Sequence, residues 1–213
     1  MSDSFILTLK EIFALIFAYI VGSIPTALIV ARHLKGEDIR RVGDGNMGAQ
    51  NVSHVVGTKY GILVGILDMG KGSLSILVGM ALGLSTGWLM VCGIFAILGH
   101  DFPIFARFKG GQGTATTVGT YLVFFPLNTT VSLVVYGLLY AIIKRHTLSA
   151  SIAGGLLLLQ LIFIRKPWYL LVYVLALFII IPIKKAADLH RVKEIAARHQ
   201  EELLHQKAHS KKI

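Results

Sequence analysis

The stretch "IFALIFAYIVGSIPTALIVA", residues 12–31, contains no charged side chain. A helix of this length covers about 30 Å, which is the thickness of the hydrocarbon core of a bilayer. The stretch therefore predicts a membrane-spanning helix, which we place near residues 10–31. Pro25 lies inside it. Because proline lacks a backbone N–H and clashes with the preceding turn, we expect a kink there.

Further apolar stretches of this kind follow along the chain. Hydrophobic residues make up 54% of the 213 residues and charged residues only 15%, which is too apolar for an ordinary soluble domain. The pattern predicts an all-α, polytopic integral membrane protein, with a membrane domain over residues 1–186 and a basic, partly helical tail over residues 187–213. The helix near 113–126 is short and either crosses the bilayer or dips into it. About seven helices are expected, near residues 10–31, 61–83, 87–106, 113–126, 129–143, 148–164 and 168–183.

Basic residues are distributed unevenly between the expected loops. Lysine and arginine follow the first, third, fifth and seventh helices, whereas only Lys10, Arg165 and Lys166 fall on the other side. By the positive-inside rule, the N-terminus lies outside and the C-terminus lies in the cytoplasm. Most of the net charge of +10 then faces the cytoplasm, where it meets anionic lipid headgroups. Nucleic-acid binding explains the charge less well, because no separate basic domain with interleaved aromatic residues exists.

Cysteine and histidine patterns restrict the chemistry. Cys92 is the only cysteine, which excludes a disulfide within the chain and a cysteine zinc site. No spacing of histidine and glutamate suggests a metal site, so we expect neither a metal nor a cofactor. The first apolar stretch lacks a basic leader and a small-residue cleavage site, and we therefore expect no signal peptide.

Three polar loops on the predicted cytoplasmic side are rich in glycine or basic residues. They read "GEDIRRVGDGNMGAQNVSHVVG" (36–57), "RFKGGQGTAT" (107–116) and "KRHTLSAS" (144–151). Glycine lets backbone N–H groups converge on an anion, and lysine and arginine add charge. Any one such loop, taken alone, is better explained as a flexible turn with positive-inside charge. Three of them on one face favour a phosphate site at the cytoplasmic surface of the membrane.

Charged residues also occur inside apolar segments. Asp68 and Lys71 lie three residues apart in "LDMGKG", so they share one helix face and can form a pair. Either charge alone costs about 2.5–3.5 kcal/mol at the centre of a membrane helix. A structural pair and direct contact with a substrate both remain open. His100, in "GHDFPIF", is a candidate base, a candidate phosphate donor, or a helix-capping residue.

Five motifs occur in a fixed order: "GSIPTALIV" (22–30), "GEDIRRVGDGNMGAQN" (36–51), "LDMGKG" (67–72), "GHDFPIFARFKGGQGTAT" (99–116) and "SASI" (149–152). Over residues 18–185 this order and spacing resemble the bacterial acyl-phosphate-dependent glycerol-3-phosphate acyltransferases, the PlsY family. The resemblance implies a seven-helix membrane protein whose loops form a cytoplasmic pocket. It implies transfer of a fatty acyl group from acyl phosphate to glycerol 3-phosphate, giving lysophosphatidic acid for phospholipid synthesis. It implies no metal and no acyl-CoA, and it makes an enzyme that supplies acyl phosphate a candidate partner.

The residues and the resemblance together define a set of candidate site residues. The candidate catalytic residues are Asp44, His54 and His100, with the phosphate of the substrate itself as an alternative base. The expected substrate-binding residues are Arg40, Asn46, Asn51, Lys71, Lys109, Gly110, Gly111, Gln112, Gly113, Thr116 and Ser151.

The chain departs from the family pattern at three of these positions. Asp44 stands where the family usually has serine, His54 where it has arginine, and Gln112 where it has lysine. The resemblance assigns these positions to substrate phosphate, so the changes remove two cations and add an anion. Three functions therefore stay open: an acyltransferase acting on glycerol 3-phosphate, a related enzyme with another acceptor, and a non-catalytic membrane protein that binds a lipid phosphate.

Overall fold

The computed structural model describes residues 3–210, and within this range the chain is helical with no strand. Six helical segments are long and apolar enough to cross a membrane, which agrees with the expected polytopic all-α class. The short helix α6 has 11 residues and extends only about 16 Å, so it does not reach across a bilayer unaided. The elements are α1 (Asp3–Gly22), α2 (Thr26–Lys35), α3 (Ala49–Val55), α4 (Thr58–Ala81), α5 (Thr86–Asp101), the 3-10 turn η1 (Ile104–Ala106), α6 (Thr114–Phe124), α7 (Pro126–Ile143), α8 (His146–Phe163) and α9 (Trp168–Ser210).

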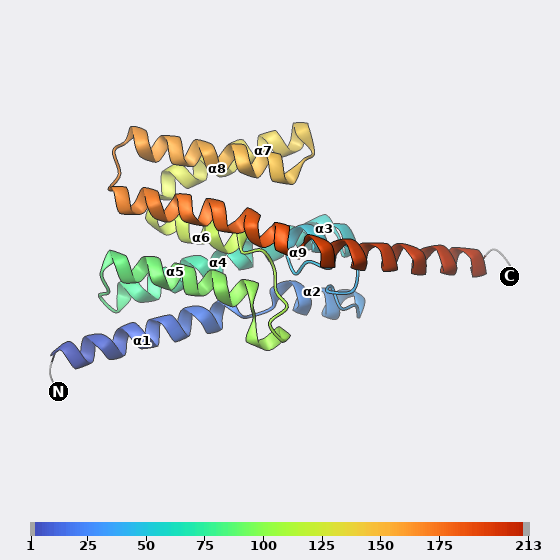
Figure 1. Ribbon diagram of the computed structural model, residues 1–213, viewed down its shortest axis with the longest axis horizontal. Helices are drawn as coiled ribbons and strands as arrows, with labels where there is room; N and C mark the ends of the chain where they lie inside the picture. The colour runs from blue at the N-terminus through green and yellow to red at the C-terminus, as the bar shows by residue number, and fades with distance from the viewer. Residues whose placement is uncertain (1–2, 211–213) are drawn as a thin grey trace.

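The long helices run along the long axis of the molecule, and the chain passes back and forth between its two ends (Figure 1). The elements α2, α3 and η1 and the C-terminal part of α9 lie at one end, which we call the loop end. The N-terminus and the turn between α4 and α5 lie at the opposite end. The two longest polar loops expected from the sequence are therefore at the same end of the bundle.

The first expected helix, near residues 10–31, is in fact two helices. Residues 23–25 are not helical and separate α1 from α2. Pro25 has no N–H to continue the hydrogen-bond ladder and disfavours a helical conformation at Ile24, so it breaks the helix, where we had expected only a kink. The carbonyl of Ile24, at the break, accepts a hydrogen bond from the backbone N–H of Thr26 and another from the ammonium of Lys71 in α4.

The last expected membrane helix and the tail form one continuous helix. α9 has 43 residues and includes Pro182, which did not end it. Lys184 forms an ion pair with Asp188 one turn later, so the basic residues that marked the expected end are accommodated on the helix surface. This continuity carries residues of the tail to the loop end.

Close contact between backbones fixes the start of α6 against α4. A Cβ atom on Gly72 would overlap the carbonyl of Thr116, and one on Gly119 would overlap the carbonyl of Met69. Small residues at such a crossing let membrane helices approach closely. The loop that leads into α6 is therefore anchored at its far end by rigid helix packing.

The polar loop after α2 is packed and belongs to the core. Ile39 and Val52 are fully buried in a cluster with Leu28 of α2 and Val64 of α4. A flexible turn would leave such side chains exposed to water. The reading of this loop as a mobile turn is wrong, because its apolar residues anchor it to two helices.

Candidate functional site

A cavity of about 280 Å³ opens at the loop end between three segments of the chain. We call it the basic cavity. It lies between the first loop (residues 36–48), the glycine loop (residues 107–113) and the tail part of α9. Five of its eight lining residues are cations and none is acidic, which makes it a site for an anion. The lining residues are Arg40, Arg41, Gly45, Arg107, Lys109, Gly110, Ile195 and Arg198.

Asn51 organises the first loop from its centre. Its side chain is fully buried, and its amide nitrogen lies 3.0–3.1 Å from the carbonyl oxygens of Ile39, Val42 and Asn46. Its amide oxygen accepts a hydrogen bond from the backbone N–H of Asp44 at 3.1 Å. Both polar atoms of the Asn51 side chain therefore form hydrogen bonds within the loop. Asn51 stabilises the loop conformation and does not line the basic cavity.

Asp44 is likewise engaged by the loop backbone. Its carboxylate accepts a hydrogen bond from the N–H of Asn46 at 2.9 Å, in the turn geometry common for aspartate. Neither Asp44 nor Asn46 lines the basic cavity. The Asp44 carboxylate, which was expected to repel a phosphate, therefore does not line the cavity and accepts a hydrogen bond from a backbone N–H.

Arg40 connects the first loop to the segment before the glycine loop. Its guanidinium forms two hydrogen bonds to the Asp38 carboxylate, at 2.8 and 2.6 Å, and a third to the carbonyl of Ala106 at 3.0 Å. The hydrogen bonds from Arg40 hold the pKa of Asp38 well below its usual range, and Asp38 raises the pKa of Arg40 in turn. Arg40 is therefore a fixed cation in the cavity wall, partly neutralised by its partner.

The glycine loop is held in an uncommon backbone conformation. Arg107 and Phe108 have φ values of +57° and +59°, and Gly113 has +66°. Left-handed residues other than glycine cost free energy and often mark functional segments. Gly110 and Gly111 are buried, and the N–H of Gly111 donates to the carbonyl of His100 at 3.1 Å. The loop then enters α6, whose N-terminus carries the favourable end of the helix dipole.

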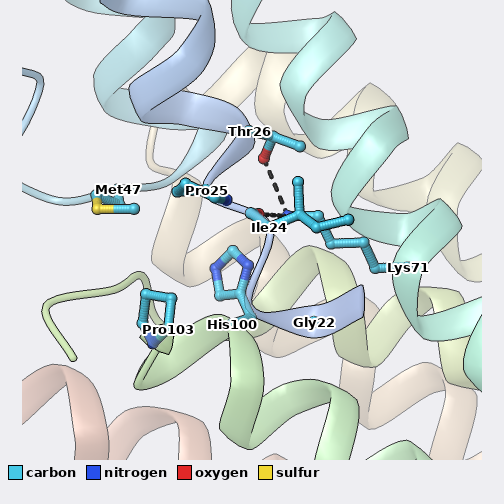
Figure 2. A pocket seen from close by; sticks show the side chains of 8 residues that line it. All are labelled: Gly22, Ile24, Pro25, Thr26, Met47, Lys71, His100 and Pro103. Atoms are coloured by element: carbon cyan, nitrogen blue, oxygen red, sulfur yellow. Dashed lines mark hydrogen bonds between the residues drawn. The ribbon is translucent and has the colours of Figure 1, made fainter. Parts of the chain in front are cut away.

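A second, much smaller cavity of about 10 Å³ lies beside the break between α1 and α2 (Figure 2). Lys71 and His100, two of the expected site residues, both face it. Neither lines the basic cavity. The complete lining is Gly22, Ile24, Pro25, Thr26, Met47, Lys71, His100 and Pro103.

The remaining candidates lie outside both cavities. His54 on α3 and Ser151 on α8 are exposed. Gln112 and Gly113 belong to the glycine loop without lining either cavity. Thr116 is fully buried in α6, and nothing in the described part of the chain forms a hydrogen bond with its hydroxyl oxygen. Across the described residues, no group of three histidine, cysteine, aspartate or glutamate side chains could hold a metal ion.

Several lining residues of the basic cavity were not among the candidates from the sequence. Arg41 and Arg107 belong to the loops that were predicted to bind phosphate, but neither was named as an individual site residue. Ile195 and Arg198 belong to the tail, for which a helix on the membrane surface was favoured over a cap on the site. A Cβ atom on Gly45 would lie 2.7 Å from the Cδ1 atom of Ile195, so the tail packs directly on the first loop.

The sequence model of the glycerol-3-phosphate acyltransferase family matches residues 12–194. The chain belongs to this family. Glycerol-3-phosphate acyltransferase 2 of Bacillus anthracis is 42% identical over 174 residues, which cover 81% of this chain and 89% of the relative. Glycerol-3-phosphate acyltransferase 2 of Moorella thermoacetica is 38% identical over 89% of this chain and 96% of its own length.

The fold agrees with a solved member of the family. The crystal structure of PlsY, an integral membrane glycerol 3-phosphate acyltransferase, in its glycerol 3-phosphate form superimposes with a TM-score of 0.76 at 32% identity. The superposition covers 87% of this chain and 93% of that one. The family membership and the multi-pass membrane fold expected from the five motifs are thereby confirmed.

Proposed function

We propose that this chain is a membrane glycerol-3-phosphate acyltransferase that takes its acyl group from an acyl phosphate and releases lysophosphatidic acid. The observation that carries the proposal is the basic cavity, which is walled by the two loops that hold two of the family's five motifs. Its five cations suit two phosphate-bearing substrates, since a phosphate monoester carries about −1.5 to −2 charges at neutral pH. We place the reaction at the cytoplasmic face of the bacterial inner membrane, as a step of phospholipid synthesis.

Acyl phosphate is a mixed anhydride and is already activated toward attack. A hydroxyl oxygen of glycerol 3-phosphate forms a bond to the acyl carbon, and the bond between that carbon and the phosphate oxygen breaks. The electron pair leaves with the inorganic phosphate, and the hydroxyl proton is transferred to that phosphate. The protein therefore has to hold two anions close together and orient them, and positioning of this kind is worth roughly 7–11 kcal/mol in favourable cases.

The lining of the basic cavity suggests the division of roles. Arg40, Arg41 and Lys109 bind phosphate oxygens, and arginine does so with two parallel hydrogen bonds. The N–H groups of Phe108, Lys109 and Gly111 donate to carbonyl groups of the chain. The other N–H groups of the glycine loop and the N-terminus of α6 stabilise the charge that develops on the leaving phosphate. No candidate base is needed in this scheme, which agrees with the places of Asp44, His54 and His100 outside the lining.

The departures from the family pattern are compatible with this activity. The cations missing at Gln112 and His54 are matched in number by Arg107 and Arg198, which line the cavity from the glycine loop and from the tail. We propose that these two arginines supply the positive charge that the usual lysine and arginine provide in the family.

The decisive experiment is an assay of the purified full-length protein in lipid vesicles, with acyl phosphate as donor and product detection by mass spectrometry. Glycerol 3-phosphate, glycerol and other phosphorylated alcohols are offered in competition, and acyl-CoA serves as the control donor. We expect lysophosphatidic acid from acyl phosphate and glycerol 3-phosphate. Acylation of a different acceptor would establish the altered-substrate alternative. Binding of phosphate without any product would establish the non-catalytic one.

A further inference from the structure

A group of polar side chains lies behind the glycine loop, and the proposed reaction does not use it directly. The group consists of Thr26, Asp68, Lys71 and His100, and we call it the buried charge cluster. The side chains of Asp68, Lys71 and His100 are only 1%, 6% and 7% exposed. Ionisable residues buried among membrane helices are costly, and they are kept where they pair with one another or serve function.

Some contacts of the buried charge cluster serve to hold helices together and need no functional explanation. The Lys71 ammonium donates to the Asp68 carboxylate at 2.7 Å, to the Thr26 hydroxyl at 3.2 Å and to the carbonyl of Ile24. The Thr26 hydroxyl donates in turn to the same Asp68 oxygen at 2.6 Å. All three ammonium hydrogens are used, and together they tie α4 to the break between α1 and α2. Figure 2 shows Lys71 reaching this break.

Asp68 makes more contacts than this pairing requires. The Nδ1 atom of His100 lies 3.7 Å from the carboxylate oxygen that Lys71 and Thr26 also contact. The second carboxylate oxygen is buried, and among residues 3–210 it has no hydrogen-bond partner. A carboxylate this close favours the imidazole orientation in which Nδ1 carries the hydrogen and points toward it.

The opposite edge of the His100 ring faces the glycine loop. A Cβ atom placed on Gly111 would overlap the Nε2 atom of His100, and the same residue's carbonyl accepts the N–H of Gly111 at 3.1 Å. The neighbouring Gly110 also packs against the His100 carbonyl, and it lines the basic cavity. A continuous chain of contacts therefore runs from Asp68 through His100 to the backbone that walls the cavity.

We propose that Asp68 is a positioning residue for acyl transfer, which holds the His100 imidazole so that this ring fixes the backbone of the glycine loop. The inference rests on the proposed function, because it assigns that loop to a phosphate of the substrates. Backbone N–H groups stabilise an anion only when they are aligned before it binds, and a displacement of about 1 Å can cost about 100-fold in rate. A buried ring packed against Gly111, with the backbone carbonyl of the same residue against Gly110, supplies the required rigidity.

A purely structural role for Asp68 predicts a different result, and a double-mutant cycle separates the two. Asp68→Asn, His100→Gln and the double variant are compared for binding of inorganic phosphate by calorimetry, for kcat and KM, and for Tm. Ser75→Ala is the matched control, because its buried hydroxyl also lies on α4 and contacts only the Lys71 carbonyl among the described hydrogen bonds. Phosphate binding needs no turnover, so this measurement is independent of the acyl-transfer assay.

We expect each single variant to weaken phosphate binding about tenfold and the double variant to be no weaker than the worse single one, because both act along one chain of contacts. In contrast, Asp68→Asn lowers Tm both in the wild-type protein and in the His100→Gln variant, because Lys71 loses its charged partner whether or not His100 is present. Ser75→Ala leaves phosphate binding unchanged. If Asp68→Asn does not fold, Asp68→Asn combined with Lys71→Met removes both charges, and it still weakens phosphate binding.

Independent effects of Asp68 and His100 on phosphate binding would overturn the proposal, as would an Asp68→Asn variant with lower Tm but unchanged phosphate affinity. A wild-type protein that binds no phosphate at the loop would overturn it as well. A wild-type protein that binds phosphate but makes no lysophosphatidic acid contradicts only the proposed function, and the cycle on phosphate binding then still decides the role of Asp68.

Discussion

Gly111 leaves no room for a side chain, because any Cβ atom would overlap the imidazole of His100 behind it. His100 is itself buried, so the ring cannot move aside without repacking. Overpacking of this kind costs roughly 1–3 kcal/mol, and here the backbone of the glycine loop would shift. We expect Gly111→Ala to lower kcat/KM for acyl transfer by about tenfold or more.

The matched control for this substitution is Gly155→Ala in α8, where a new Cβ atom meets nothing within 4 Å. We expect it to leave kinetics unchanged and to keep Tm the same or raise it slightly. Equal kinetics for both alanine variants would show that the glycine loop tolerates displacement and does not position a phosphate.

Lys109 is an exposed cation in the wall of the basic cavity. Charge-assisted hydrogen bonds contribute about 1.5–3 kcal/mol each, so Lys109→Ala should raise KM for a phosphate-bearing substrate by about 10- to 100-fold. Tm should not change, because the side chain is exposed and packs against little. Lys35→Ala, another exposed lysine near the same end, is the control, and steady-state kinetics with both substrates is the measurement. A similar loss in both variants would point to a general surface-charge effect.

The sequence predicted the kinds of residue that form the site better than it predicted which individual residues line the basic cavity. Lys109 and Gly110 were predicted from a cationic, glycine-rich motif, and both line the basic cavity. Asn51 was expected to hold substrate, yet its side chain is saturated by backbone partners of its own loop. An asparagine that binds a ligand and one that closes a loop look the same in a sequence, because the difference lies in which carbonyl groups surround it.

Among the elements, five of the seven expected helices begin and end within five residues of α4, α5, α6, α7 and α8, whereas the first is divided at Pro25 and the last continues into the tail. Apolar composition identifies a membrane helix, but it does not say whether proline kinks or breaks it. At Pro25 the helix breaks, and Lys71, a residue of another helix, donates a hydrogen bond to the Ile24 carbonyl there. At Pro182 no break occurs, and α9 continues into the tail. Such tertiary partners cannot be identified from local sequence alone.

The tail part of α9 contributes a wall of the basic cavity through Ile195 and Arg198. We expect Arg198→Gln to raise KM for glycerol 3-phosphate by about tenfold with little change in Tm, because an exposed cation is lost and the packing of the helix is kept. Lys193→Gln is the matched control, since Lys193 is exposed on the same helix and does not line the cavity. A larger effect at Lys193 than at Arg198 would exclude the tail wall as a substrate contact.

At the scale of the whole molecule, the chain brings distant segments together at one end. The first loop, the glycine loop and the tail are separated by long helices in the sequence and converge at the loop end (Figure 1). The alternating distribution of lysine and arginine predicted this convergence, because loops on one side of a membrane share a face. It could not predict the depth of the cavity or its tail wall, which follow from helix tilts and from the length of α9.

The sidedness of the molecule is the remaining prediction from the charge distribution. With Cys92 replaced by alanine, single cysteines are introduced as Glu37→Cys in the first loop and as Ser85→Cys in the turn between α4 and α5. Both positions are exposed, and the two segments lie at opposite ends of the bundle.

Moving several lysine and arginine side chains across the bilayer is unfavourable, so the loop end should face the cytoplasm. In intact spheroplasts, a membrane-impermeant maleimide should label the cysteine at position 85 at once, and the one at position 37 only after permeabilisation. Labelling of position 37 from outside, with position 85 protected, would place the basic cavity on the outer face, away from a cytoplasmic supply of acyl phosphate.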